Sequence, residues 1–179
     1  MVERSEDGAL RAFVMDFGLA REWDQDVTET GSVLGTPAYM SPEQARGELG
    51  LLDRRTDVYG LGATLYHAAT GRHPIPGSNA LEILSAISST EVEPMRTRSP
   101  HIPVDLEAIV LKCLEKDRAR RYDSAKALAD DLDRFLAGEP VADRGNAERR
   151  QIRHALLHDL RHDEEVVLAE RRVGEHLAG

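Results

Sequence analysis

The sequence predicts a mainly helical domain that opens with a small β-hairpin. Apolar residues recur at the three- and four-residue spacing of helices through most of the stretch from 56 to 136. Before it, the turn sequence Glu6-Asp7-Gly8 precedes a short apolar run from Ala12 to Met15, which favours a strand. Residues 18–42 lack periodicity and are rich in Thr, Gly, Asp and Glu, which is typical of a long functional loop.

The longest predicted helix covers 56–70. Val58, Leu61 and Leu65 follow helical spacing there, and Gly71 is a favoured residue just past a helix end. Further apolar residues flank this stripe, so the helix is apolar around most of its circumference. We therefore expect it to be buried.

Three further helices are predicted downstream. Two cover 80–88 and 104–115, and a third begins after the N-cap residue Ser124 and ends at Gly138. The charged segment 145–179 carries one narrow apolar stripe and is predicted to be a helical tail. Such a tail can dock on the domain, pair with another helix, or stay frayed.

Composition excludes several classes of protein. The formal net charge of −9 argues against a non-specific grip on nucleic acid or on an anionic membrane. A single cysteine, Cys113, excludes an intramolecular disulfide. The sequence has no apolar run of about 18 residues, and charged residues near its start argue against a signal peptide. These features predict a cytoplasmic protein with no membrane segment and no nucleic-acid partner.

Four short motifs follow one another in an order and spacing that resemble the bacterial-type (eukaryotic-like) serine/threonine protein kinases. They are DFG at Asp16–Gly18, GTPAYMSPEQ at Gly35–Gln44, TDVYGLG at Thr56–Gly62, and Lys116-Asp117 followed by Arg121-Tyr122. The resemblance covers 1–144 and implies the large, C-terminal lobe of a kinase, with the N-terminal lobe absent. Arg118 departs from the pattern because the family usually has proline there.

The resemblance implies a magnesium ligand at Asp16. In kinases, this aspartate holds Mg²⁺ that is bound to ATP, and the following residues, here Phe17 and Gly18, set its pose. ATP and magnesium are thus the cofactors of the intact family.

Thr28 and Thr30 are the candidate phospho-acceptors of the predicted activation loop. Phosphate added there must find an arginine in order to fix the loop. The family's arginine for this purpose is missing from the sequence, and nearby Glu22 and Asp26 would repel a phosphate. Phosphorylation and an ordinary surface-loop role for these threonines both remain open.

The resemblance also implies a ledge that receives the substrate residue beside the phospho-acceptor. Gly35, Thr36, Pro37 and Tyr39 occupy the matching positions of GTPAY. Protein substrates are accordingly the expected partners.

Three charged residues are expected to be structural. By resemblance, Glu43 and Arg121 form a buried ion pair that ties the end of the activation segment to the lobe. Asp57 matches a residue that binds the backbone of the catalytic loop in kinases. Because that loop is missing from the sequence, we expect Asp57 either to face water or to cap its own helix.

Other kinase signatures are missing from the 179 residues. The sequence has no glycine-rich loop, no phosphate-binding lysine strand, no helix with its paired glutamate, and no H-R-D-x-x-x-x-N catalytic loop. We therefore expect the chain alone to have no catalytic residues and no tight ATP or magnesium binding. The favoured interpretation is that the start was misassigned or that the sequence is a gene fragment whose N-terminal lobe is missing. A non-catalytic docking or regulatory module and a degenerate relic are the alternatives.

Overall fold

The computed structural model describes residues 2–5, 8, 10–12, 37–142, 144–145 and 152. The chain divides into two compact units, 1–35 and 36–179, which are considered separately. The charged tail, apart from residues 145 and 152, lies outside the described residues, so its helical character stays a prediction.

The first unit contains the predicted β-hairpin. Strand β1 (Val2–Arg4) pairs antiparallel with β2 (Leu10–Ala12), with Glu3 opposite Arg11. In the turn between the strands, the Gly8 N–H donates to the carbonyl of Ser5 at 2.9 Å. The second strand therefore begins at Leu10, earlier than the predicted start at Ala12; residues 13–15 lie outside the described part of the chain.

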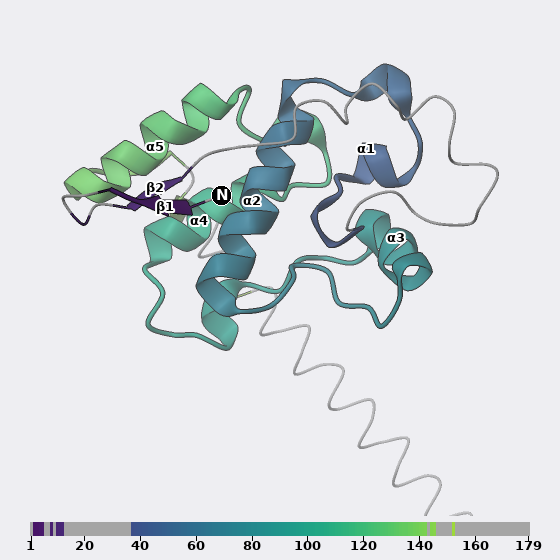
Figure 1. Cartoon of the computed structure of the whole chain (residues 1–179), viewed down its shortest axis with the longest axis horizontal. Helices are drawn as coiled ribbons and strands as arrows, with labels where there is room; N and C mark the ends of the chain where they lie inside the picture. The colour runs from purple at the N-terminus through teal and green to yellow at the C-terminus, as the bar shows by residue number, and fades with distance from the viewer. Residues whose placement is uncertain are drawn as a thin grey trace, which may run out of the picture. The chain divides into compact units, whose positions relative to one another are not determined.

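The second unit is helical (Figure 1). Its helices are α1 (Pro42–Ala45), α2 (Arg54–Thr70), α3 (Ala80–Ser89), α4 (Val104–Cys113) and α5 (Ala125–Ala137). Short 3-10 turns lie between them: η2 (Pro37–Tyr39), η3 (Leu49–Leu51), η4 (Met95–Thr97) and η5 (Arg118–Arg120). Helix α2 lies between α4 and α5 on one side and α1 and α3 on the other.

Side-chain caps and glycines set the helix ends. Asp53 caps α2 by accepting a hydrogen bond from the Arg55 N–H at 2.8 Å, so α2 begins two residues before the predicted start. Ser124 caps α5 as predicted. Helices α2 and α5 end at Gly71 and Gly138, whose φ values of 69° and 73° suit glycine, which has no Cβ to clash.

The core has two clusters that share α2. The first is formed by Val58, Ala108, Ile109, Cys113, Tyr122, Leu128 and Val141. The second is formed by Tyr59, Ala63, Tyr66, Met95, Ile102, Val110 and Leu114. Helix α2 supplies residues to both clusters, but its buried residues are Val58, Tyr59, Gly62, Ala63 and Tyr66. The expectation that the helix is buried therefore holds for one side of it and not for its whole circumference. Among the described helices, none is long and apolar enough to cross a membrane.

Candidate functional site

The predicted site residues divide between described and undescribed parts of the chain. Those outside the described residues are Asp16, Phe17, Gly18, Thr28, Thr30, Gly35 and Thr36. Those that the structure places are Pro37, Tyr39, Glu43, Asp57 and Arg121. The site is therefore built from the end of the predicted activation segment and the helices that hold it.

A capping box fixes the backbone at the start of α1. The Ser41 Oγ accepts a hydrogen bond from the Gln44 N–H, and the Gln44 Oε1 accepts one from the Ser41 N–H at 3.0 Å. Pro42 follows at the start of the helix, where its missing N–H has no cost. This turn directs Glu43 inward, and its side chain is 2% exposed.

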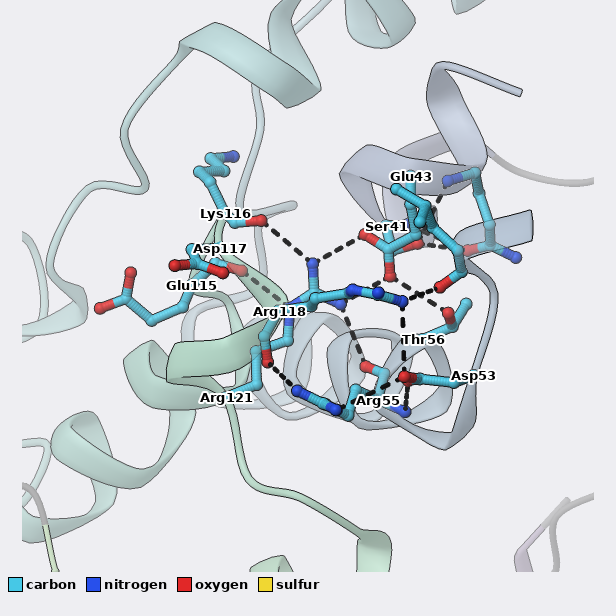
Figure 2. Close-up of polar contacts among 12 residues, drawn as sticks. Ser41, Glu43, Asp53, Arg55, Thr56, Glu115, Lys116, Asp117, Arg118 and Arg121 are labelled. Carbon is cyan, nitrogen blue, oxygen red and sulfur yellow. Dashed lines mark hydrogen bonds and ion pairs between the residues drawn. The ribbon is translucent and has the colours of Figure 1, made fainter. Parts of the chain in front are cut away.

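Glu43 and Arg121 form a bidentate ion pair, as Figure 2 shows. The Arg121 Nη1 donates to Glu43 Oε1 at 2.7 Å, and Nη2 donates to Oε2 at 2.8 Å. The Thr56 hydroxyl from α2 also donates to Oε1, at 3.1 Å. Both charged side chains are buried, so this fork geometry replaces the water that each group has lost.

The remaining N–H groups of Arg121 donate to three backbone carbonyls. The Nε donates to Glu115 at 2.8 Å, Nη1 to Arg55 at 3.1 Å, and Nη2 to Lys116 at 3.3 Å. Together with the two bonds to Glu43, these contacts use all five donors of the guanidinium. The guanidinium carbon also lies 5.0 Å from the centre of the Tyr59 ring. Arg121 thus joins the segment after α4 to α1 and α2.

The pKa of Glu43 reflects two opposed effects. Burial would raise this pKa, but hydrogen bonds from Arg121 and the backbone, together with the Arg121 charge, outweigh burial and lower it from 4.5 to about 2. Glu43 is therefore ionised at neutral pH. The Glu43–Arg121 ion pair therefore has a structural role. A carboxylate whose oxygens already accept hydrogen bonds and whose pKa is this low is unsuited to act as a general base.

A second polar cluster lies beside the pair and includes Arg118, the residue that stands where kinases usually have proline (Figure 2). The Arg118 Nη1 donates to the carbonyl of Leu51 and lies 3.5 Å from Asp53 Oδ2. The Arg55 Nη1 in turn donates to the Arg118 carbonyl at 3.4 Å. Arg118 thus holds η5 against the start of α2. Sequence reasoning missed this role, because no local pattern links positions 65 residues apart.

Tyr39 and Pro37, two of the predicted ledge residues, share the turn η2. The Tyr39 hydroxyl lies 2.6 Å from Nδ1 of His67, in the last turn of α2. His73 packs edge-on against the Tyr39 ring at 5.3 Å and lies 4.3 Å from the His67 ring, measured between centroids. Sequence reasoning missed both histidines, whose only link to Tyr39 is spatial.

Asp57 is exposed and does not cap α2, because Asp53 takes that position. Of the two alternatives for Asp57, capping is therefore wrong, and the side chain faces water. The reason is that helix α2 begins at Arg54, which puts Asp57 inside its first turn.

Two other carboxylates of the described residues are buried. Asp131 accepts hydrogen bonds from the Tyr122 hydroxyl at 2.6 Å and from the Ala142 N–H at 3.2 Å, which holds the chain after α5. Glu107 accepts a hydrogen bond from the Arg96 N–H at 2.7 Å, but burial raises its pKa above the ordinary value. Within the described part of the chain, no group of three or more His, Cys, Asp or Glu side chains is placed to hold a metal ion.

Comparison with known proteins matches residues 3–132 to the protein kinase domain family. This chain belongs to that family. The serine/threonine-protein kinase PknB of Mycobacterium leprae is 42% identical over 129 residues, which is 71% of this chain and 20% of that protein. The probable PknB of Bifidobacterium longum is 39% identical over 142 residues, covering 77% and 20% of the two chains. The tyrosine-protein kinase MasK of Myxococcus xanthus is 43% identical over 125 residues, covering 69% and 19%.

The comparisons and the fold agree. The described helices, α1 to α5, form part of the large, C-terminal lobe of a bacterial-type protein kinase, as the motifs predicted. The chain spans about a fifth of the length of the curated relatives it matches.

Proposed function

We propose that this chain is the C-terminal part of a serine/threonine protein kinase, a transferase that moves a phosphoryl group from ATP to serine or threonine of a protein. The observation that carries the proposal is the buried Glu43–Arg121 pair, which fixes the end of the activation segment to the lobe. A fixed segment is what phosphoryl transfer needs, because the reaction depends mainly on positioning and on neutralising phosphate charge. Two of the relatives named above are serine/threonine kinases, which favours that acceptor class.

Each remaining site residue has a proposed role in the complete enzyme. Asp16 would hold magnesium beneath the phosphates of ATP, with Phe17 and Gly18 setting its pose. Thr28 and Thr30 would accept the phosphate that orders the loop. Gly35, Thr36, Pro37 and Tyr39 would form the ledge beside the acceptor hydroxyl; the shared turn η2 of Pro37 and Tyr39 supports this proposal.

We further propose that the 179 residues alone are catalytically incompetent. The catalytic aspartate, the second magnesium ligand and the phosphate-binding lysine of kinases have no counterpart in the sequence. The chain should therefore transfer no phosphate from labelled Mg-ATP to serine or threonine peptides. Phosphate transfer by the unmutated 179-residue chain that is lost in the Asp16→Asn variant would contradict the proposed incompetence. Genomic DNA upstream of Met1 should encode an in-frame H-R-D-x-x-x-x-N loop and a glycine-rich loop.

A docking or regulatory module is the second candidate function. It is favoured by one observation: among the described residues, the members of both core clusters all lie in the second unit. A monomeric chain with a cooperative thermal transition, and with no kinase signatures encoded upstream, would support the module. A chain that aggregates on expression would count against it.

A further inference from the structure

Tyr39, His67 and His73 form a cluster of three rings at the proposed substrate ledge. Tyr39 comes from η2, His67 from the last turn of α2, and His73 from the loop that follows. His73 is exposed and the other two side chains are half-buried, so a bound peptide can reach the cluster. The motifs that define the kinase resemblance assign no role to either histidine.

The short bond between Tyr39 and His67 can run in two directions. A neutral His67 can accept from the Tyr39 O–H at Nδ1, and its own proton is then on Nε2. A protonated His67 carries hydrogen on both nitrogens, so Nδ1 must donate and the Tyr39 oxygen must accept. The tyrosine hydroxyl hydrogen is then released from His67 and free to point toward a ligand.

Of the two histidines, His67 is the one whose ring nitrogen is bonded to the Tyr39 hydroxyl. It lies in the last turn of α2. Loss of some hydration beside the other rings, together with the neighbouring His67, lowers the pKa of His73. Within the described part of the chain, the titratable groups that contact His67 are Tyr39 and His73, and no carboxylate or cation there forms an ion pair with either imidazole.

We propose that Tyr39, His67 and His73 form a proton-dependent recognition point for substrate. With His67 neutral, the Tyr39 oxygen offers a lone pair, which suits a peptide N–H. With His67 protonated, the Tyr39 O–H and the added positive charge suit an acidic residue beside the phospho-acceptor. The substrate class is thus a serine or threonine peptide with a neighbouring carboxylate, bound better as pH falls. The substrate part of this inference rests on the proposed function.

The first test follows the imidazole nitrogens of the 179-residue chain by NMR. At pH 8, His67 should carry its proton on Nε2, and Tyr39→Phe should remove that preference. His101, an exposed histidine outside the cluster, is the internal reference. A proton on Nδ1 of His67 at pH 8, or an unchanged His67 spectrum in Tyr39→Phe, would overturn the switch. The position of the His67 proton at pH 8 is measured on the unmutated chain, so the test still works if the Tyr39→Phe variant does not fold.

The second test titrates the same chain with two serine peptides that differ only in aspartate or asparagine after the serine. From pH 8 to pH 6 the preference for the aspartate peptide should rise roughly two- to fivefold, the range of an exposed charge contact. His101→Gln should keep this rise, and His67→Gln should abolish it. An equal preference at both pH values, the same rise in His67→Gln, or no binding at millimolar peptide would refute recognition. Neither test uses ATP, so a failure of kinase activity is distinguishable from both results.

Discussion

Arg121→Ala is the most informative single change to the lobe. It removes all five hydrogen-bond donors of the guanidinium at once. The Glu43 carboxylate then stays buried with neutral donors alone, among them the Thr56 hydroxyl, and the backbone carbonyls of Arg55, Glu115 and Lys116 each lose a donor. A buried charge without its partner is the dominant cost.

The expected magnitude follows from the burial of both partners. Breaking one side of a buried ion pair costs about 3–5 kcal/mol of unfolding free energy. For a chain of this size, each kcal/mol lowers the melting temperature by about 2–4 °C. Arg121→Ala should therefore lower the melting temperature by about 6–20 °C, measured by circular dichroism at pH 7.

Arg98→Ala is the matched control, since Arg98 also pairs with a glutamate through hydrogen bonds. Its Nε lies 3.0 Å from both carboxylate oxygens of Glu93, but the Arg98 side chain is 60% exposed. Exposed pairs contribute about 0–1 kcal/mol, so this variant should melt within a few degrees of the unmutated chain. If Arg121→Ala melts no lower than Arg98→Ala, the Glu43–Arg121 pair does not hold the segment to the lobe.

Three further outcomes are expected. The folded pKa of Glu43 near 2 lies below the ordinary 4.5, so its stabilisation of roughly 3 kcal/mol is present above pH 4.5 and lost as pH falls toward 2. Glu43→Gln should flatten that acid loss in urea titrations. Burial raises the pKa of Glu107, so ionising Glu107 destabilises the folded chain, and stability falls as pH rises above 4.5. The stability of Glu107→Gln relative to the unmutated chain should therefore increase between pH 4 and pH 7. Gly62→Ala should cost about 1–3 kcal/mol, because the new Cβ would lie 2.4 Å from the Cys113 Cβ and force α2 away from α4; an unchanged melting temperature would contradict this packing.

Local signals predicted the helices well. Ser124 and Gly138 bound α5 as expected, because a serine cap and a left-handed glycine act through neighbouring backbone groups. The predicted start of α2 at 56 lies two residues after the observed start, because Asp53 and Asp57 are both plausible caps and only the loop geometry selects Asp53. Helix α4 ends at Cys113, two residues before the predicted end, since apolar periodicity continues past the last helical turn.

Long-range contacts could not be read from local patterns. Glu43 and Arg121 are 78 residues apart, and only the motif resemblance suggested that they pair. Nothing in the sequence suggested that Arg121 also reaches three carbonyls, or that Arg118 contacts Leu51 and Asp53. The Tyr39–His67 bond was missed for the same reason, because side chains 28 residues apart meet only once α2 packs beside η2.

The most direct test of the proposed kinase function is to complete the enzyme. The part of the M. leprae PknB kinase that precedes the matching segment would be fused to this chain, and transfer from labelled ATP to a serine peptide would be measured. We predict transfer by the fusion, none by the 179 residues alone, and loss of transfer in the fusion that carries Asp16→Asn. A fusion that melts cooperatively, binds Mg-ATP and still transfers no phosphate would contradict the assignment of this lobe to an active kinase.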